Sequence, residues 1–404
     1  MEFKIKQGLR IAIVTETFPP EVNGVAMTLG RIVEGLLQRG FVVQLIRPRQ
    51  SVDDKLHSGD GVELVLAKGM PIPTYQDLRL GLPMKGTLCK LWTLQRPDIV
   101  HVATEGPLGW SAVCAASKLK LPVTSSFHTN FHRYSQHYGI GLFTRLIDRY
   151  LCKLHNRTDA TLVPTRAMMR ELQERSYKKV MLLSRGVATS LFSPEKRSHE
   201  LRKSWGATQD EVVVLFVSRL AREKNVGLVI EAFQTIRLRL PGAKLVLVGD
   251  GPLRKQLQAD CPQAVFAGVR KGEDLAAHYA SGDVFLFPSL TETFGNVVPE
   301  ALASGLAVLS YANAAARELI ITGQNGVLIN PGAAAEFIEA AAALASDKAL
   351  QNTLRLAAPA SVTQLSWDAV HNSFAETLCK TIAQHQTPGS SRAGSTLPVS
   401  PSSA

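Results

Sequence analysis

The sequence lacks the cysteine patterns of disulfide-bonded and zinc-binding proteins. Its five cysteines are widely scattered and include no Cys-x-x-Cys pair. An odd, dispersed set of this kind argues against a disulfide framework and against a zinc site. The chain also has no apolar stretch approaching the roughly 20 residues of a membrane span, and the apolar run before Thr15 is too short for the core of a signal peptide. We therefore expect a protein of the reducing cytoplasm.

Two motifs of nucleotide and metal binding are missing as well. The chain has no G-x-G-x-x-G, which leaves a dinucleotide-binding fingerprint unsupported, and no Asp-x-Asp pair. His128, His132 and His137 are four and five positions apart, but no cysteine or acidic residue accompanies them. We therefore expect no bound metal and no cofactor. His128 directly follows a predicted strand and is a candidate for contacting a ligand in a cleft, whereas His132, His137 and His101 are expected to be surface or packing residues.

The positive charge is confined to the first half of the chain. Residues 1–190 hold 26 Lys and Arg against 15 Asp and Glu, whereas residues 191–404 hold 19 of each, so the net charge of +11 belongs to the first half. A basic half indicates an anionic surface or substrate, such as nucleic acid or acidic lipid. A charge that serves only solubility is the plainer alternative.

Short runs rich in Val, Ile and Leu alternate with helical stretches along most of the chain. This pattern is typical of parallel sheets covered by helices on both faces. The first series of predicted strands is LRIAIVTE, FVVQLIRP, RPDIVHVA, LPVTSSFH, ATLVPT and KVMLLSRG, and the second is EVVVLFVSRL, AKLVLVGDG, AVFAGV, DVFLFPS and AVLSYA. The segment between the two series is more polar and has no strand pattern.

The sequence therefore predicts an α/β protein with two doubly wound, Rossmann-like domains. The first domain is expected over residues 1–187 and the second over 188–365, followed by a terminal helix at 366–385 and a disordered tail at 386–404 that is rich in Ser, Pro and Gly. Ligands of such sheets bind beyond the carboxyl ends of the strands. Candidate residues should therefore lie just after strands, facing a cleft between the domains.

The stretch SLTETFGNVVPEALASG follows a predicted strand and carries Glu292 and Glu300, eight positions apart. Glu292 should lie on the loop and Glu300 in a short helix that Asn296 caps and Gly305 ends. The free amides of the Phe-Gly-Asn turn would then face an anion beyond the sheet. The simpler alternative is that Glu300 only complements a helix N-terminus and Glu292 is a solvated loop charge.

Two further loops follow predicted strands. VSRLAREKNVG places Arg219 and Lys224 where a bidentate guanidinium and a point charge could clamp a pyrophosphate leaving group in place of a metal ion. Asn23 and Gly24 precede a helix that closes at Gly40, so Gly24 can bring its backbone amide close to a phosphate. A solvated basic loop and an ordinary Asn-Gly turn are the respective alternatives.

In this order, these residues resemble the retaining glycosyltransferases of family four, which have the GT-B architecture of two facing Rossmann-like domains. The matching stretches are FPPEVNGV, SSFHTNF, SRGVATSLFSP, VSRLAREKN, VGDGP and TETFGNVVPEALASG, the last of which is similar to the family's Glu-x7-Glu signature. The resemblance covers about residues 10–385. TETFGNVV and FHTNF are most similar to the branch with GDP-mannose-dependent α-mannosyltransferases and sulfoquinovosyl or glucosyl lipid transferases.

The resemblance implies a nucleotide-sugar donor, GDP-mannose or a UDP-hexose, and metal-independent transfer of its hexose, mannose favoured, to a lipid or glycan. Glu292 would bind hydroxyls of the donor sugar and Glu300 the ribose. Arg219 and Lys224 would hold the diphosphate, and His128 would face the sugar near its reacting carbon. Other donor contacts are implied for Asn23, Gly24, Gly249, Val269, Phe294, Gly295, Asn296 and Val297.

One departure and two alternatives accompany the resemblance. Family members commonly have Gly-Val-Asp where this chain has Gly186, Val187 and Ala188, so a linker contact of that acid is missing. A phosphorylase or a nucleotide-sugar epimerase on the same fold is the alternative enzyme. A nucleic-acid-binding protein would rest on the basic first half alone, because the sequence shows no zinc finger, RNA-binding sheet motif or basic recognition helix.

The segment GIGLFTRLIDRYLCKLHNR, residues 139–157, predicts an amphipathic helix. Apolar and basic side chains recur in it at helical spacing: Leu142, Phe143, Leu146, Ile147, Tyr150 and Leu154 beside Arg145, Arg149, Lys153 and Arg157. Together with the basic first half, this pattern predicts reversible docking on the anionic inner face of a membrane, where a lipid acceptor would be collected. The alternative is that the apolar stripe packs into the first domain's core.

Overall fold

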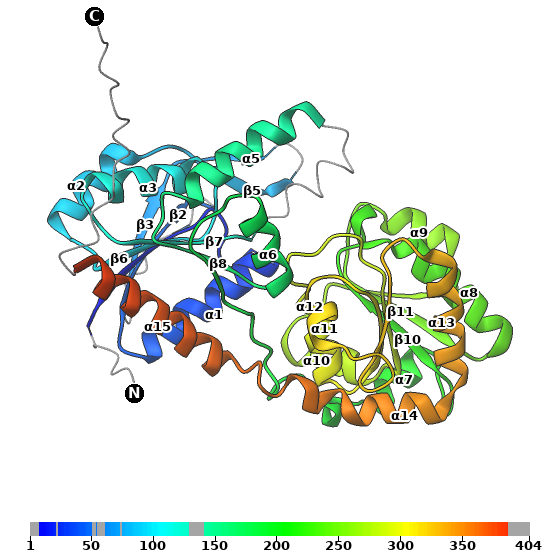
Figure 1. Cartoon of the computed structure of the whole chain (residues 1–404). Coiled ribbons are helices and arrows are strands. Elements are labelled where there is room, and N and C mark those ends of the chain that lie inside the picture. Colours follow the sequence, from blue (N-terminus) through cyan, green and yellow to red (C-terminus); the bar gives the residue numbers. More distant parts are fainter. Residues whose placement is uncertain are drawn as a thin grey trace, which may run out of the picture.

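The structure is a computed structural model that describes residues 8–21, 23–50, 54, 61–72, 75–128 and 141–386, without the side chains of 72, 75–78 and 141–144. Two parallel sheets, each covered by helices, form two lobes that lie side by side (Figure 1). His132, His137 and the predicted tail beyond residue 386 lie outside the described residues. The predicted α/β architecture of two Rossmann-like domains is confirmed.

The first sheet has the strand order β3-β2-β1-β6-β7-β8-β9, and its paired strands are parallel. Its strands are β1 (Arg10–Val14), β2 (Val42–Pro48), β3 (Val62–Ala67), β6 (Ile99–Val102), β7 (Val123–Ser126), β8 (Ala160–Val163) and β9 (Val180–Leu182). The helices along this half are α1 (Gly24–Gln38), α2 (Lys85–Leu94), α3 (Pro107–Lys118), α5 (Gly141–His155) and α6 (Arg166–Glu174). An antiparallel hairpin joins β4 (Gly69–Ile72) to β5 (Tyr75–Gly81).

The second sheet has the order β12-β11-β10-β13-β14-β15 and is also parallel. Its strands are β10 (Val213–Val217), β11 (Lys244–Val248), β12 (Val265–Gly268), β13 (Val284–Phe287), β14 (Ala307–Tyr311) and β15 (Val327–Ile329). Its helices are α7 (His199–Ser204), α8 (Val226–Arg239), α9 (Arg254–Asp260), α10 (Gly272–Ala280), α11 (Val297–Ala303), α12 (Ala314–Leu319), α13 (Ala334–Ser346) and α14 (Lys348–Ala357). Short 3-10 turns are η1 (Pro194–Lys196), η2 (Arg222–Lys224) and η3 (Pro359–Val362).

The side-chain alternation of β1 explains the two faces of the first sheet. Ile11 and Ile13 pack with α1 on one face, whereas Ala12 and Val14 pack with α2 and α3 on the other. In the second domain all five residues of β10 are buried, as expected for a central parallel strand covered on both faces. Each predicted strand contains an observed one, and β3, the β4–β5 hairpin and β15 were not predicted.

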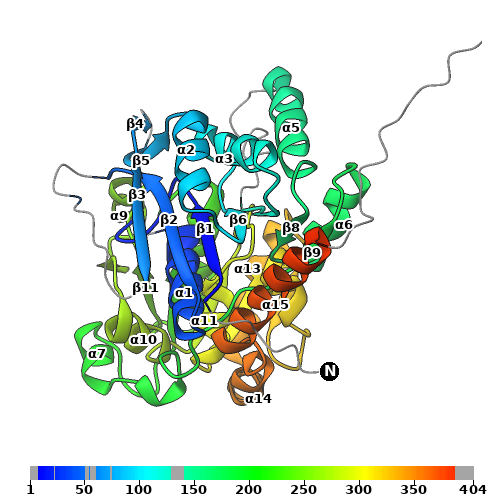
Figure 2. The same cartoon turned by 90° about the vertical axis from the view of Figure 1, so that its left-hand side faces the viewer.

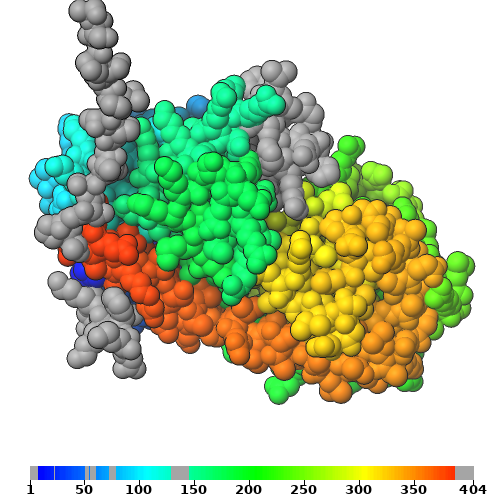
Figure 3. Space-filling view, viewed as in Figure 1, coloured from blue at the N-terminus to red at the C-terminus, as the bar shows by residue number. Residues whose placement is uncertain are grey.

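The chain crosses between the lobes twice. The first crossing follows β9, and the second leads from η3 into α15 (Trp367–Gln386), which returns to the first lobe and packs beside α1 (Figure 2). Phe374, Ala375 and Leu378 of α15 belong to the core that contains Ile11 and Ile13. Figure 3 shows the segment from α14 through α15 running along one face of the molecule from the second lobe to the first.

Backbone contacts tie the two crossings together. Val187 donates to the carbonyl of Leu365 at 2.8 Å and forms an isolated parallel bridge with Ser366. The methyl side chain of Ala188 cannot make the contact expected of an acid at this position, and its backbone carbonyl accepts hydrogen bonds from the amides of Leu191 and Phe192. The linker is therefore held by its backbone.

Asp283, just before β13, anchors the segment after the linker to the second sheet. Its side chain is 8% exposed and accepts hydrogen bonds from Arg197 (2.7 Å), Arg202 (2.9 Å) and Arg355 (3.2 Å), which come from three different elements. The backbone amide of Val213 donates to the same carboxylate at 2.8 Å. One buried carboxylate thus joins the linker region, α7 and α14 to the start of β10.

Candidate active site

Lys224 and Glu292 meet at the carboxyl edge of the second sheet. Lys224 ends η2, which follows β10, and Glu292 lies on the loop after β13; because β10 and β13 are adjacent, the two loops are neighbours. Lys224 Nζ donates to Glu292 Oε1, and Ser289 Oγ donates to the same oxygen at 2.8 Å. The two side chains are 15% and 12% exposed. The ion pair is therefore largely shielded from water, which strengthens its electrostatics.

Arg219 lies on the same loop as Lys224. Its guanidinium pairs with Glu223, whose side chain is 4% exposed, while the side chain of Arg219 itself is 39% exposed. The buried carboxylate therefore orients the guanidinium and leaves much of its surface toward solvent. Both cations predicted to clamp a diphosphate lie at the same edge of the sheet, each held by a carboxylate.

Glu300 lies in the first turn of α11, behind the loop that carries Glu292. Its Oε2 accepts a hydrogen bond from the hydroxyl of Tyr279 on α10 at 2.9 Å. Burial raises the pKa of Glu300 to about 7, and the hydrogen bond from Tyr279 opposes this shift. This buried carboxyl group therefore changes its charge near neutral pH, beside the hydroxyl of Tyr279.

The turn between the two glutamates exposes backbone donors. Gly295 has φ of +84°, and the amides of Phe294, Gly295, Asn296 and Val297 donate to no acceptor within the described residues. The predicted capping role of Asn296 is wrong in one respect: it occupies the N-cap position with helical φ and ψ, and its side chain makes no cap hydrogen bond. Instead, its Oδ1 accepts from Arg185 NH1 at 3.3 Å, because the helical backbone turns the side chain toward the other domain.

Asn23 and Gly24 open α1 in the first domain. Asn23 Oδ1 caps the helix by accepting from the amides of Val25 and Ala26, and its Nδ2 donates to the hydroxyl of Thr17 at 2.7 Å. The side chain of Asn23 is thus engaged locally and serves to place Gly24. A Cβ on Gly24 would lie 3.5 Å from Arg185 Nη1 and 3.9 Å from Asn296 Nδ2, so α1 begins directly against the residues through which the two domains meet.

His128 lies two residues beyond β7, and both domains contact it. Its backbone carbonyl accepts from the Thr293 hydroxyl of the second domain at 2.9 Å, and its Nδ1 lies 3.3 Å from Arg185 NH2. Burial, followed by the charge of Arg185, holds the pKa of His128 well below its usual value. The imidazole is therefore neutral at physiological pH.

Arg185 lies among the candidate site residues, and the sequence analysis did not predict it. It follows β9 in the linker, is 6% exposed, and contacts His128 of the first domain and Asn296 of the second. Its guanidinium carbon also lies 5.8 Å from the centre of the Phe294 ring. The available signal was its position at the end of the predicted strand KVMLLSRG, where the matching stretch SRGVATSLFSP begins.

Gly249 and Val269 lie at the ends of β11 and β12. A Cβ on Gly249 would come within 1.9 Å of the carbonyl oxygen of Ser218, and its φ is +132°. Close packing of two strand ends therefore already requires glycine there. Val269 is 56% exposed at the same edge of the sheet, so its position agrees with a ligand contact made through the backbone.

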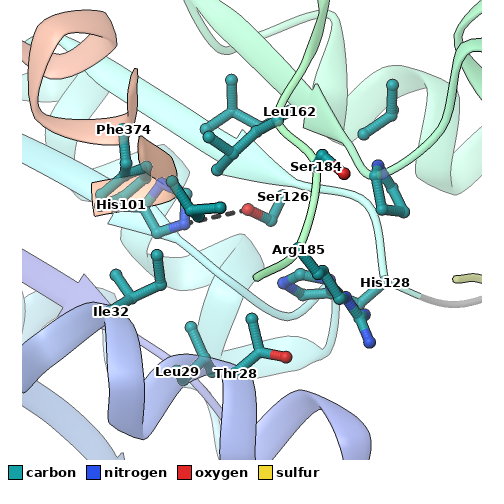
Figure 4. A pocket seen from close by; sticks show the side chains of 14 residues that line it. Thr28, Leu29, Ile32, His101, Ser126, His128, Leu162, Ser184, Arg185 and Phe374 are labelled. Carbon is teal, nitrogen blue, oxygen red and sulfur yellow. Dashed lines mark hydrogen bonds between the residues drawn. The ribbon is translucent and has the colours of Figure 1, made fainter. Parts of the chain in front are cut away.

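A small cavity of about 20 Å³ lies beneath His128, between α1, β7, β8 and α15 (Figure 4). This volume holds about one water molecule, so the cavity is too small for a sugar. His101 lines it, 1% exposed, with Nε2 3.1 Å from Ser126 Oγ and Nδ1 2.9 Å from Thr124 Oγ1. His101 is a packing residue, as predicted, and burial lowers its pKa to about 3.

An acidic pair at the carboxyl edge of the first sheet was also missed. Glu16 follows β1 and accepts from the amide of Leu108 at 3.1 Å, at the start of α3. Burial raises its pKa to about 7, with a contribution from nearby Glu105. Glu105 lies 3.7 Å from Nε2 of buried His155, and the Tyr150 hydroxyl donates to its backbone carbonyl. The pair stabilises the start of α3 on the first domain's side of the cleft.

The amphipathic segment forms α5, and only part of its apolar stripe packs inward. Leu151 and Leu154 are 4% and 0% exposed, whereas Leu146 is 59% exposed and both Ile147 and Tyr150 are 36% exposed. The side chains of Leu142 and Phe143 lie outside the description. Arg145, Arg149, Lys153 and Arg157 are all exposed. The carboxyl-terminal part of α5 therefore joins the core, and the preceding turns combine apolar and basic side chains on the surface.

The described residues contain neither a membrane-spanning helix nor a cluster of metal ligands. No helix among them is long and apolar enough to cross a membrane. Within the same residues, no group of three or more His, Cys, Asp and Glu side chains is placed to hold a metal ion.

Known families match both halves of the chain. Residues 22–191 match the model described as Glycosyltransferase Family 4, and residues 211–347 match the model described as Glycosyl transferases group 1. Among curated proteins, a GDP-mannose-dependent alpha-mannosyltransferase of Corynebacterium glutamicum is 33% identical over 383 residues, which cover 95% of this chain and 89% of the relative. An enzyme of the same description from Mycobacterium tuberculosis is 36% identical over 330 residues, covering 80% and 85%. The sulfoquinovosyl transferase of Arabidopsis thaliana is 28% identical over 371 residues, covering 89% and 71%.

Solved structures share the two-domain fold. The Anabaena protein HepE, crystallised with UDP, has a TM-score of 0.75 at 20% identity, and the match covers 92% of this chain and 100% of that chain. Sucrose-phosphate synthase from Thermosynechococcus elongatus has a TM-score of 0.71 at 17% identity, covering 93% and 100%. At these identities, the likeness concerns the fold.

Proposed function

The chain belongs to glycosyltransferase family four and has the GT-B fold, and from this we propose that it transfers mannose from GDP-mannose to a lipid or glycan acceptor. The enzyme is a glycosyltransferase that moves a hexose from a nucleotide sugar. The choice of mannose and of a GDP donor is supported by the relatives at 33% and 36% identity, both described as GDP-mannose-dependent. A UDP-hexose is the second candidate donor.

The observation that carries the proposal is the contact between Lys224 and Glu292, together with Glu300 in the first turn of the helix that follows the Glu292 loop. A donor has a diphosphate between its sugar and its ribose, so it needs a cation flanked by two groups that accept hydroxyl hydrogen bonds. Lys224 supplies the cation, and Glu292 and Glu300 supply the two acceptors. In this assignment Glu292 binds the sugar and Glu300 the ribose, while the turn amides contact sugar and phosphate.

We propose that the transfer retains the anomeric configuration of the sugar and needs no divalent metal. The acceptor hydroxyl oxygen forms a bond to the sugar C1 on the face from which the nucleoside diphosphate leaves. The bond between C1 and the β-phosphate oxygen breaks, and a phosphate oxygen takes the hydroxyl proton. Lys224 and Arg219 stabilise the negative charge that develops on the diphosphate, which is the largest contribution such a site can make.

Basic and apolar side chains on α5 support a membrane-bound acceptor. Each Lys or Arg near an anionic surface contributes about 1 kcal/mol, and Arg145, Arg149 and Lys153 are exposed beside Leu146 and Ile147. The first domain would then dock reversibly from the cytoplasmic side and meet its acceptor there. A soluble glycan acceptor is the competing case.

The donor is tested by thermal shift and product analysis on the full chain. Matched samples with GDP-mannose, GDP, UDP-glucose, UDP and UDP-sulfoquinovose compare the contributions of the sugar and of the base separately. A ligand at about 100 times its Kd stabilises the folded protein by roughly 2.7 kcal/mol, which is a measurable shift. We expect the largest shift with GDP or GDP-mannose. A shift with UDP compounds alone would show that the donor is a UDP-sugar and that GDP-mannose is the wrong assignment. Release of free nucleotide that requires inorganic phosphate in place of a lipid or glycan acceptor would point instead to a phosphorylase, and conversion of the donor to another nucleotide sugar would point to an epimerase.

A further inference from the structure

Arg185 is the linker residue whose side chain lies between the two domains. It is buried between the start of α1, the end of β7 and the loop before α11, and Figure 4 shows its side chain next to that of His128. Its NH1 is 3.3 Å from Asn296 Oδ1, and its NH2 is 3.3 Å from His128 Nδ1. One guanidinium therefore contacts a polar side chain from each domain.

The chemistry of this contact fixes the position of a proton on His128. A guanidinium has five N–H donors, no acceptor, and stays protonated in proteins. Nδ1 of His128 must therefore accept the hydrogen bond from Arg185. In a neutral imidazole the ring proton then belongs to Nε2, so Nε2 is left as a donor.

The surroundings of His128 keep the ring neutral. The charged or titratable groups that act on it are Arg185, His101 and His155, and each of them lowers its pKa, after burial as the largest cause. His101 is held by Thr124 and Ser126, and His155 faces Glu105. Among the residues that the structure describes, no carboxylate is one of the groups that act on His128, so none of these groups favours the imidazolium.

We propose that Arg185 is a positioning residue that holds His128 as the Nε2–H tautomer and fixes the ring relative to Asn296 of the second domain. In this state His128 can donate one hydrogen bond and can accept none at Nε2. It suits a hydroxyl or ring oxygen of the donor sugar as an acceptor. This role in transfer rests on the proposed function, whereas the tautomer itself does not.

A purely structural role for Arg185 is the competing explanation. Arg185 Nε makes no hydrogen bond within the described residues, and the two side chains that its guanidinium hydrogen-bonds are uncharged, while the charge of Glu292 acts on the guanidinium against the cost of burial. The contacts of Arg185 are those of a group that orients its neighbours.

The tautomer is measured by nitrogen NMR on the full chain labelled with ¹⁵N-histidine, with no nucleotide added. The His128 signals are assigned by their loss in His128→Gln. We expect a protonated Nε2 and an unprotonated Nδ1 that stay unchanged from pH 5.5 to pH 8. A protonated Nδ1, or titration of the ring within this range, would overturn the proposal, and this measurement needs no variant of Arg185.

Arg185→Met then tests the dependence on the guanidinium, with Arg185→Lys as the variant that keeps a charge but not the fork. We expect His128 in Arg185→Met to populate both tautomers and to titrate at higher pH. If Arg185→Met does not fold, as judged by circular dichroism, the His128 spectrum of Arg185→Lys is compared with that of the unaltered protein instead. An unchanged His128 spectrum in the folded variant contradicts the proposal.

A double-mutant cycle tests whether Arg185 acts through His128 in catalysis. We expect Arg185→Met to lower kcat/KM by about 10²-fold, the scale of misplacing a reacting group by an ångström. In the His128→Gln background the same change should cost less than about threefold, because coupled residues are not additive. Additive losses overturn the positioning role. Absence of transferase activity in the unaltered protein would instead remove the proposed function and leave the tautomer measurement intact.

Discussion

Lys224 and Glu292 form an ion pair that joins the loop after β10 to the loop after β13. The two residues are assigned to adjacent parts of one donor, the diphosphate and the sugar. A phosphate that approaches Lys224 competes with Glu292 for its ammonium, and Glu292 then becomes available to a sugar hydroxyl. In this assignment, donor binding replaces the contact between Lys224 and Glu292 with two others, from Lys224 to a phosphate and from Glu292 to a sugar hydroxyl.

Replacing Lys224 tests this exchange. We expect Lys224→Ala to lower kcat by about 10²-fold or more, the loss found when one preorganised charge stabiliser is removed. Steady-state kinetics with GDP-mannose provide the measurement, and Lys255→Ala, at an exposed position of α9, is the matched control. Unchanged turnover in Lys224→Ala would remove this residue from the mechanism.

The two glutamates should separate sugar recognition from nucleotide recognition. Glu300→Ala is expected to weaken GDP binding by about tenfold, a loss of roughly 1.4 kcal/mol, because the ribose loses its acceptor. Glu292→Ala should leave GDP binding nearly unchanged and reduce the preference for GDP-mannose over GDP-glucose. Isothermal titration with GDP and with both sugars provides the comparison. Equal GDP affinity in both variants and the unaltered protein would show that Glu300 does not bind the ribose.

The raised pKa of Glu300 also predicts a pH-dependent stability. Its pKa is about 7 in the folded chain, against an ordinary value of 4.5. The folded state therefore binds the proton more tightly, and this contribution is fully present below about pH 4.5 and is lost as pH rises through 7. We expect Glu300→Gln, which cannot ionise, to gain about 2 kcal/mol relative to the unaltered protein between pH 5 and pH 8.

Urea denaturation of both proteins at several pH values measures this gain. Glu16 also has a pKa of about 7, so both proteins should lose stability with rising pH. The difference in stability between the two proteins at each pH therefore reports the contribution of Glu300 alone. Parallel stability curves would mean that Glu300 titrates alike in the folded and unfolded chains.

Asp283 is expected to be critical for the second domain's stability. Asp283→Asn removes the charge that Arg197, Arg202 and Arg355 share, and it leaves buried Arg202 without its counter-ion. Breaking a buried ion pair typically costs about 3–5 kcal/mol, so we expect the second domain's Tm to fall by roughly 10 °C. Scanning calorimetry measures the shift, with exposed Asp260→Asn as the control. A shift no larger than the control's would show that the network contributes little.

Membrane docking should depend on the exposed part of α5. We expect sedimentation with vesicles containing phosphatidylglycerol at low salt, release at high salt, and no binding to neutral vesicles. Leu146→Glu together with Arg149→Glu should abolish binding, whereas Leu238→Glu on α8, which replaces a leucine that is 85% exposed, should not. Binding that ignores lipid charge, or none at low salt, favours a soluble acceptor.

The sequence predicted the fold well because parallel strands buried on both faces leave an unambiguous apolar signature. VVLFV in β10 and RIAIV in β1 are of this kind. The elements that were missed have weaker patterns. VELVLA in β3 is an edge strand of mostly half-buried residues, and VLI in β15 has only three residues at the other sheet's edge.

The position of a candidate site residue was predictable where one local motif places it. Glu292, Glu300, Arg219 and Lys224 each follow a strand of one sheet, so the topology alone brings them to one edge. Arg185 was not predictable in the same way, because its partners His128 and Asn296 are 57 and 111 positions away and belong to different domains. Only the packing of the two lobes reveals that contact.

The return of α15 to the first lobe has a consequence for synthesis of the chain. The second domain's core is built from residues between Val187 and Val362, a continuous stretch. The core behind β1 and α1 also needs Val370, Phe374, Leu378 and Ile382, near the end of the described chain. On the ribosome, the domain that is made first must therefore wait with part of one sheet face uncovered until translation is nearly complete, and the domain that is made second is the first to acquire all its core residues.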